Sequence, residues 1–262
     1  MKKFLVIGNP INHSLSPRLQ SWWLKENNID ATYDKIKLED HEIKNFIKDI
    51  KQQKVAGCNV TVPFKKTVIP FLDKLSSEAK KTQSVNTITF DNGDLVGHNT
   101  DIAGFDNAIK NLNFSMKGKK VLILGAGGVV PSIIFALKNM DVSKIIVSNR
   151  TKKKAENLKS YFHNLEVRDW GDISDFDVII NATSLGLDKE VINLNFSKAV
   201  TNKLFYDVIY NPSETNFLKE GKKTLNKVEN GKLMFAYQAS EAFKLWHGIK
   251  PEINKNALEL LE

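Results

Sequence analysis

The sequence predicts an α/β fold in two parts, built around mainly parallel sheets. Apolar segments of strand length alternate with segments of helical periodicity along the chain. A glycine-rich turn, Gly125-Ala126-Gly127-Gly128, separates an uncharged apolar strand from an apolar helix. This arrangement is typical of a Rossmann-like, doubly wound nucleotide-binding domain. The length of 262 residues suits one large domain or two of ordinary size.

The first hundred residues are expected to form one α/β unit. Ser16 is suited to cap a helix and Pro17 to occupy its first turn. The pair Asn92-Gly93 between two apolar segments predicts a hairpin. Strands are expected at 3–7, 31–36, 57–62, 87–90 and 94–98. Helices are expected at 17–27, 39–52, 65–75 and 78–83.

The second part begins with a linking helix over 102–112 and continues in the rhythm of strand, helix and strand. Its strands are expected at 119–124, 144–148, 177–181 and 204–208. Its helices are expected at 130–140 and 152–162. After Gly231 the chain is expected to be helical again over 233–247 and 251–261, and these helices could close either domain.

The composition argues against several classes of protein. The formal net charge is +8, but the 38 basic residues are almost all lysines scattered through every segment. A nucleic-acid binder more often clusters its charge and uses arginine for base contacts, so a solvated lysine-rich surface is the simpler interpretation. A positive field would also help to capture small anionic substrates. A single cysteine and five dispersed histidines predict neither a disulfide nor a metal site.

Two segments imitate membrane signals. The apolar run after Met1 ends at Gly8, which is shorter than the roughly 7–15 residues of a secretory leader. The uncharged stretch 121–137 is shorter than the ~20 residues of a spanning helix, and glycines and Pro131 interrupt it. We therefore expect a cytoplasmic protein that binds neither membranes nor nucleic acid.

The residues after the second strand of the nucleotide-binding part indicate which dinucleotide binds. Sites for NAD usually place an acidic residue there for the ribose 2′-hydroxyl. This chain instead has Asn149, Arg150, Thr151 and Lys152, with no acid among them. Because a guanidinium can fork onto a phosphate, these residues favour NADP(H).

The first part carries a second set of polar residues. Two hydroxyls, Ser14 and Ser16, stand at a helix start, and Thr61 and Lys65 follow a strand. Short polar groups also follow apolar segments at Asn86-Thr87 and at Asn99-Thr100-Asp101. Together they supply hydroxyl, amide, cation and carboxylate groups, which suit a small polyhydroxylated acid.

With these motifs the chain resembles the shikimate dehydrogenase family. The matching segments are SLSP (14–17), NVTVPFK (59–65), SVNT (84–87), GHNTD (97–101), GAGG (125–128), NRT (149–151), NATSLG (181–186), DVIYNPSET (207–215) and NG-KLMFAYQA (230–239). The resemblance implies NADPH-dependent reduction of 3-dehydroshikimate to shikimate in chorismate and aromatic amino acid biosynthesis. It also implies a substrate domain over 1–100, with helices 235–262 packed back on it, and an NADP-binding domain over 101–234.

The resemblance also implies roles for individual residues. Lys65 and Asp101 match the catalytic pair. The residues that match substrate ligands are Ser14, Ser16, Thr61, Asn86, Tyr210 and Gln238. The residues that match cofactor contacts are Gly125, Ala126, Gly127, Gly128, Val129, Asn149, Arg150, Thr151, Lys152, Ala182, Thr183, Val208 and Gly231. No metal is implied, and the protein would be a monomer or a homodimer.

The chain departs from the family pattern at a few positions. Val130 and Pro131 stand where the family usually has small residues, Gln20-Ser21 where it often has His-Asn, and Leu233 where it has a second glycine. These departures bear on cofactor affinity more than on the reaction. Three alternatives stay open: a quinate/shikimate dehydrogenase that uses NAD, a non-catalytic NADP-binding regulatory protein and a basic nucleic-acid module. An intact Lys65–Asp101 pair argues against a regulator, which has no need of it.

Overall fold

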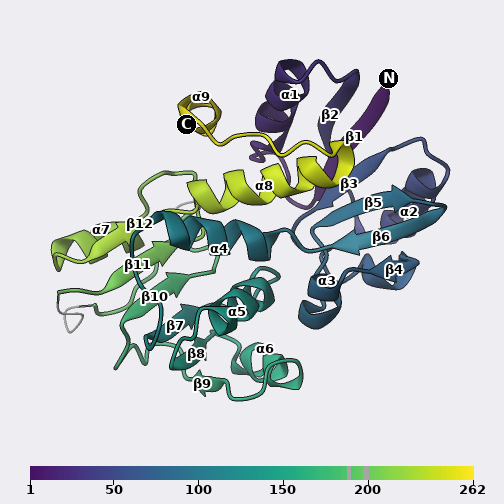
Figure 1. Cartoon of the computed structure of the whole chain (residues 1–262). Helices are drawn as coiled ribbons and strands as arrows, with labels where there is room; N and C mark the ends of the chain where they lie inside the picture. The colour runs from purple at the N-terminus through teal and green to yellow at the C-terminus, as the bar shows by residue number, and fades with distance from the viewer. Residues whose placement is uncertain (188–189, 197–200) are drawn as a thin grey trace. The chain divides into compact units, whose positions relative to one another are not determined.

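The computed structural model describes residues 1–187, 190–196 and 201–262. The chain divides into two compact units, Met1–Gly104 with Ala236–Leu261 and Phe105–Phe235 with Glu262. Two helices contain the points of division, α4 (Asp101–Asn111) and α8 (Lys232–His247) (Figure 1). The two-unit α/β fold predicted from the sequence is confirmed, while the exact domain limits stay a prediction.

The first unit contains a six-stranded mixed sheet in the order β2-β1-β3-β5-β6-β4. The strands are β1 (Lys2–Gly8), β2 (Ala31–Lys37), β3 (Gly57–Val60), β4 (Lys74–Leu75), β5 (Thr87–Asp91) and β6 (Asp94–His98). β1 pairs in parallel with β2 and β3, whereas β5 is antiparallel to both β3 and β6. The predicted hairpin is present, with Asn92 and Gly93 both at positive φ.

Helices cover this sheet. They are α1 (Ser16–Glu26), α2 (Ile43–Lys51), α3 (Ser77–Thr82), α9 (Lys255–Glu259) and most of α8, with 3₁₀ turns at Asp40–Glu42 and Ile69–Phe71. The predicted apolar face of α2 is buried in the core. In α8, the Trp246 indole packs against Phe4 with ring centroids 5.0 Å apart and the rings tilted by 39°, and it donates a 3.1 Å hydrogen bond to the Ile88 carbonyl.

Two local expectations for this unit are wrong. Residues 65–75 form turns, a 3₁₀ turn and β4 rather than a helix, because Pro70 lacks an amide donor and disfavours helical backbone before it. Ser16 does not cap α1: Leu15 is the cap residue and Ser16 is already helical. The Ser16 amide instead donates to Ser14 Oγ at 3.3 Å, so the Ser16 hydroxyl is not used as a helix cap.

The second unit contains a parallel sheet in the order β12-β11-β10-β7-β8-β9. The strands are β7 (Lys120–Leu124), β8 (Lys144–Ser148), β9 (Glu166–Arg168), β10 (Val178–Asn181), β11 (Leu204–Asp207) and β12 (Lys227–Glu229). The chain runs outward from β7 to β9 and then restarts at β10 on the other side of β7. The point between β7 and β10 is therefore the topological switch, where doubly wound sheets bind ligands.

The helices of the second unit are α5 (Val130–Asn139), α6 (Lys152–Glu156) and α7 (Asn216–Lys223), with a 3₁₀ turn at Asn157–Ser160. Figure 1 shows α5 and α6 beside β7–β9 and α7 beside β11 and β12. α7, β9 and β12 were not expected from the sequence. The two strands gave no signal because they are short and polar and lie at the edges of the sheet. The predicted helices at 152–162 and 251–261 are also shorter in the structure, at five α-helical residues each.

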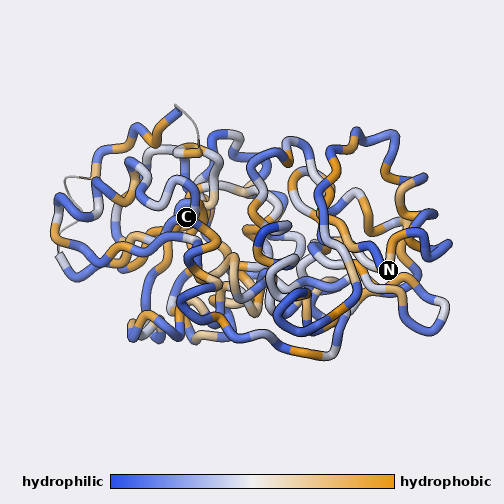
Figure 2. Tube along the Cα trace, turned by 90° about the horizontal axis from the view of Figure 1, so that it is seen from above, coloured by the Kyte–Doolittle hydropathy of each residue, from blue (hydrophilic) through white to orange (hydrophobic). Residues whose placement is uncertain are grey.

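Apolar residues form the interior of each unit, and Figure 2 shows hydrophilic segments distributed along the outer loops of the trace. One cluster in the second unit packs aromatic rings of Phe205, Phe217 and Phe196 against one another at centroid distances of 5.2–5.7 Å. In the part of the chain that the structure describes, no helix has the length and hydrophobicity needed to cross a bilayer.

Candidate active site

A buried ion pair is the central feature of the first unit. Lys65 Nζ lies 2.5 Å from Asp101 Oδ2, and the two residues are only 8% and 5% exposed. Lys65 belongs to the turns after β3, and its carbonyl accepts the Val85 amide at 2.9 Å. Asp101 is the first residue of α4, where a negative charge is favoured by the helix dipole. Two predicted catalytic residues, 36 positions apart, are thus brought together.

Asn86 links this pair to its surroundings. Its amide nitrogen donates to Asp101 Oδ1 at 2.9 Å and to Gln238 Oε1 at 3.4 Å. Its side-chain oxygen accepts the Thr100 amide at 2.8 Å. The Asn86 backbone is itself fixed by pairing with Val60 and His98. Four residues predicted from the sequence, Lys65, Asp101, Asn86 and Gln238, therefore form one hydrogen-bonded group.

Of the three predicted hydroxyl ligands of this unit, Ser14 lies in the loop after β1, Ser16 is the first residue of α1 and Thr61 directly follows β3. Ser14 and Ser16 are neighbours through the bond between the Ser14 hydroxyl and the Ser16 amide. Thr61 continues β3, and its amide donates to the Ile7 carbonyl at 2.9 Å. Gly8 has no room for a side chain here, because a Cβ would lie 2.5 Å from Thr61 Cγ2. The close packing fixes where Thr61 stands.

Sequence reasoning missed several buried polar residues that support this group. Asn59 Nδ2 donates to the Thr87 hydroxyl and to the Asn86 carbonyl, each at 3.0 Å. Tyr33 Oη donates to Asn59 Oδ1 at 2.6 Å. Asn59 lies inside the predicted motif, whereas nothing marked Tyr33.

In the second unit the glycine turn follows β7 at the topological switch. Gly125 has φ +110°, and a Cβ on it would lie 2.7 Å from the Ala182 carbonyl oxygen, so only glycine fits without strain. Gly127 is exposed, with that same oxygen 3.9 Å from the place of a Cβ. Val130, the valine that replaces a small family residue, is fully buried and belongs to the apolar interior.

The residues after β8 present cations to solvent. Arg150 and Lys152 are exposed, and Lys152 Nζ is 2.8 Å from Asp169 Oδ1. Asn149 folds back on this segment by donating to the Thr151 carbonyl at 2.8 Å. The exposed phosphate-binding chemistry expected from the sequence is therefore available, and the open turn at Gly127 fits a pyrophosphate. The residues of this unit fit a dinucleotide with an added phosphate.

A buried carboxylate organises the neighbouring loops. Asp207, at the end of β11, accepts hydrogen bonds from Asn181 Nδ2 at 2.9 Å, the Ile209 amide at 3.0 Å and the Thr215 hydroxyl at 2.5 Å. Asn181 in turn accepts the Thr183 amide at 3.0 Å. Burial raises the pKa of Asp207 to about 6. This set fixes the segments that carry the predicted cofactor contacts Ala182, Thr183 and Val208.

Two further predicted residues lie in this unit. Gly231 is buried, and a Cβ on it would come within 2.1 Å of the Val208 carbonyl oxygen. The Tyr210 ring packs on Phe235, with centroids 4.4 Å apart. Tyr210 is the one predicted substrate ligand that belongs to the second unit rather than the first.

These features define the class of the protein. A parallel sheet of this strand order, with a glycine turn at its switch point and exposed cations after the next strand, is that of a dinucleotide-binding oxidoreductase. A buried lysine–carboxylate pair in the other unit supplies acid–base chemistry.

The comparisons with known proteins identify the family. Residues 6–88 match the family model described as the shikimate dehydrogenase substrate binding domain, and residues 106–208 match that of shikimate / quinate 5-dehydrogenase. The shikimate dehydrogenase (NADP(+)) of Pelagibacter ubique is 53% identical over 262 residues, covering 100% of this chain and 99% of that protein.

Solved structures agree. Shikimate dehydrogenase from Aquifex aeolicus is 36% identical with a TM-score of 0.91, covering 100% of this chain and 97% of that one. The Thermus thermophilus enzyme, solved in complex with NADP(H) and shikimate, is 31% identical with a TM-score of 0.91 and covers 100% and 98% of the two chains. The chain belongs to the shikimate dehydrogenase family and is an NADP-dependent oxidoreductase.

Proposed function

We propose that the protein catalyses the reversible reduction of 3-dehydroshikimate to shikimate by NADPH, with Lys65 and Asp101 as its catalytic pair. The observation that carries the proposal is the buried 2.5 Å ion pair between them, joined through Asn86 to Gln238. Burial of a lysine and an aspartate is costly unless the pair is well bonded, so the arrangement calls for a functional reason.

Reduction of the ketone leaves negative charge on the carbonyl oxygen, and that charge must be stabilised and protonated. When bound, NADPH supplies the hydride. The Lys65 ammonium attracts the developing oxyanion and then donates its proton to that oxygen. In the direction of oxidation, neutral Lys65 accepts the alcohol proton. Asp101 holds Lys65 in position through Oδ2, while its Oδ1 is fixed by Asn86.

The remaining predicted residues would bind the two small molecules. Ser14, Ser16, Thr61, Asn86 and Gln238 offer hydroxyl and amide groups for the substrate's carboxylate and hydroxyls. Tyr210 is the remaining predicted substrate ligand. The cofactor would be held by Gly125, Ala126, Gly127, Gly128, Val129, Asn149, Arg150, Thr151, Lys152, Ala182, Thr183, Val208 and Gly231. Support for this assignment is the open turn at Gly127 and the exposed cations at Arg150 and Lys152.

The main alternative is a dehydrogenase that acts on quinate with NAD. An acidic residue after β8 would favour that reading, and Asn149-Arg150-Thr151 has none. A regulatory NADP-binding protein would not need the buried pair. We expect the enzyme to act in the cytoplasm as a monomer or a homodimer, and both expectations stay predictions.

The test is a steady-state assay of NADPH oxidation with 3-dehydroshikimate. NADH in place of NADPH, and quinate oxidation in place of shikimate oxidation, are the matched controls. Turnover with NADPH and 3-dehydroshikimate that exceeds both controls by at least roughly tenfold in kcat/KM is the expected result. Equal rates with NADH and NADPH, or preference for quinate, would replace the proposal by the alternative.

A further inference from the structure

Gln20 joins the helix that carries Ser16 to the helix that carries Gln238. It is a polar side chain that is only 1% exposed, and it stands at a position where the chain departs from the family pattern. Its Nε2 donates to the Ala239 carbonyl oxygen of α8 at 3.0 Å. One side chain therefore bonds two segments that lie 219 positions apart in the sequence.

Both ends of this hydrogen bond lie next to predicted substrate ligands. Ser16 is the first residue of α1, and Gln20 follows it by four positions, so the two share the buried face of the helix. Gln238 directly precedes Ala239, and its Oε1 accepts the hydrogen bond from Asn86 at 3.4 Å. The bond from Gln20 therefore fixes the turn of α8 that carries Gln238 against the turn of α1 that begins at Ser16.

An aromatic contact supports the same pairing of helices. Trp23 of α1 packs edge-on against Phe243 of α8, with ring centroids 5.9 Å apart and the rings at 72°. Trp23 follows Gln20 by three positions and Phe243 follows Ala239 by four, so the ring contact lies about one turn along each helix from the hydrogen bond. Because a hydrogen bond needs its donor and acceptor aligned, the bond from Gln20 sets the register of the two helices more strictly than the rings do.

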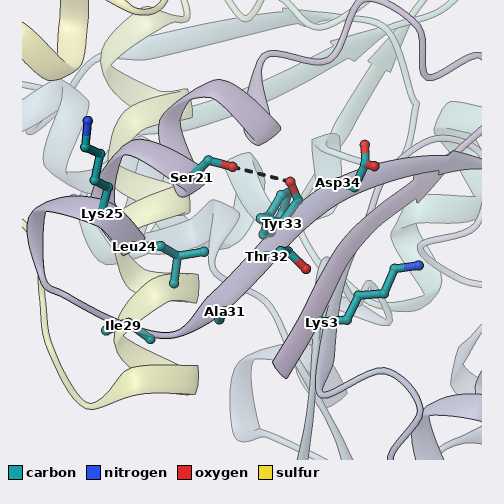
Figure 3. A pocket seen from close by; sticks show the side chains of 9 residues that line it. All are labelled: Lys3, Ser21, Leu24, Lys25, Ile29, Ala31, Thr32, Tyr33 and Asp34. Atoms are coloured by element: carbon teal, nitrogen blue, oxygen red, sulfur yellow. Dashed lines mark hydrogen bonds between the residues drawn. The ribbon is translucent and has the colours of Figure 1, made fainter. Parts of the chain in front are cut away.

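A second contact ties α1 to the sheet. Ser21, the residue after Gln20, donates from Oγ to the Tyr33 carbonyl of the edge strand β2 at 3.4 Å (Figure 3). The hollow beside this contact is lined by residues of β1, α1, β2 and the loop between α1 and β2, and Gln20 is not among them. α1 is thus held from two directions, and Gln20 supplies the bond to α8.

Packing alone does not require an amide at this place. A methionine has a similar length, and a buried amide must recover the hydrogen bonds that it loses on leaving water. Ala239 lies inside α8, where a backbone carbonyl also accepts the amide four residues further on. Loss of the Gln20 amide would therefore leave this carbonyl bonded and cost only modest stability. The main consequence of the bond is geometric.

We propose that Gln20 is a positioning residue for substrate binding, which fixes α8 against α1 and so sets the place of Gln238 relative to Ser16. This inference rests on the proposed function, because it takes Gln238 and Ser16 to be substrate ligands. Gln20 touches no reacting atom in this scheme. Its loss should weaken substrate binding and leave proton transfer at Lys65 unchanged.

The test is the kinetics of Gln20→Met in the full-length enzyme, with shikimate oxidation by NADP⁺ as the assay. The KM for shikimate should rise about fivefold, as expected for the loss of one hydrogen bond's worth of positioning. kcat and the KM for NADP⁺ should stay within about twofold. In a double-mutant cycle, Gln20→Met should add less than about twofold to the KM of Gln238→Ala, because the side chain that it positions is then absent.

Ser240→Ala is the matched control. Ser240 follows Ala239 in α8, is fully buried, and donates from Oγ to the Pro251 carbonyl at 2.9 Å, so it also makes one buried bond from a side chain to a backbone carbonyl. Its partner belongs to the C-terminal segment rather than to α1. Ser240→Ala and Gln20→Met should each lower the melting temperature by about 2–4 °C, but only Gln20→Met should change the KM for shikimate.

Two results would overturn the role of Gln20 while the proposed function stands. One is a Gln20→Met enzyme with a lower melting temperature and an unchanged KM, which would make Gln20 purely structural. The other is a double variant in which the losses of Gln20→Met and Gln238→Ala multiply. A wild-type enzyme inactive on shikimate is a different result, because it would end the proposed function and this inference with it.

Discussion

Each unit buries a carboxylate at the end of its polar network, and the two are neutralised differently. Asp101 in the first unit faces the Lys65 ammonium at 2.5 Å. Asp207 in the second unit accepts hydrogen bonds from neutral groups of Asn181, Ile209 and Thr215. The first arrangement places a mobile proton beside a stabilised anion, which is what catalysis needs. The second fixes loops in place and costs free energy whenever the carboxylate is charged.

The largest effect is expected where the cation is removed. Lys65→Met keeps the volume of the side chain but leaves Asp101 without its ammonium and the reaction without its acid. We expect kcat to fall roughly a hundredfold or more with little change in KM, because the oxygen's charge develops chiefly in the transition state. The measurement is steady-state kinetics of shikimate oxidation.

Stability serves as the control for this variant. Removing one partner of a buried pair costs about 3–5 kcal/mol, so the variant must first be shown to be folded by circular dichroism. Asp101→Asn keeps an oxygen that can accept the hydrogen bond from Asn86 but removes the negative charge, and it should also lose activity. A folded Lys65→Met enzyme that turns over at near wild-type rate would remove Lys65 from the catalytic role.

Asp207, the buried carboxylate with neutral partners, should make the stability of the protein depend on pH. The pKa of Asp207 is raised from 3.8 to about 6 by burial, so between these values the folded state binds more protons than the unfolded state. The contribution of Asp207 to stability is therefore most favourable below about pH 4 and declines as pH rises toward 6. The decline is on the order of 3 kcal/mol.

Asp207→Asn isolates this contribution from the other titrating groups. Urea unfolding of both proteins from pH 4 to pH 7.5 should show the wild type losing stability relative to the variant as pH rises through 6. Glu229 pKa is also raised by burial, but it is common to both proteins and cancels in the difference. Parallel pH curves for the two proteins would mean that Asp207 does not carry a shifted pKa.

The same contrast explains how far the sequence could predict the structure. The glycine turn and the paired Lys65 and Asp101 lie in short motifs whose chemistry is readable without a fold. The apolar strands of both sheets were predicted because burial on both faces leaves a continuous apolar run. These local signals sufficed for the two-unit fold, whereas the pairing of Lys65 with Asp101 was implied by the resemblance to the family.

What escaped prediction depends on contacts between distant segments. Tyr33 bonds to Asn59 across β1, and the strand order that brings them together cannot be read from either segment. The expected helix over 65–75 is absent because Pro70 lacks an amide donor and disfavours helical backbone at the residue before it. The expected cap at Ser16 is wrong because the helix already begins at Ser16, whose amide donates to the Ser14 hydroxyl. Edge strands β9 and β12 carry too few apolar residues to be noticed.

Exposed cations in the second unit should give a smaller and more selective effect. Arg150→Ala should raise the KM for NADPH about tenfold while the KM for NADH changes less than about twofold, since only NADPH carries the 2′-phosphate. Lys153→Ala, one helical position beyond the predicted contacts and also exposed, is the control. Equal losses with both cofactors would show that Arg150 does not read the phosphate.

The smallest effect is expected beside Asp207, at Tyr206. Its hydroxyl is buried without a hydrogen-bond partner in the part of the chain that the structure describes, whereas the Tyr33 hydroxyl donates to Asn59 Oδ1 at 2.6 Å. An unpaired buried donor costs free energy, so Tyr206→Phe should leave the free energy of unfolding unchanged or raise it by up to about 1 kcal/mol. Tyr33→Phe should instead lower it by about 1 kcal/mol. Urea unfolding of both variants compares one substitution in two environments, and a loss at Tyr206 as large as that at Tyr33 would mean that burial rather than bonding sets the cost.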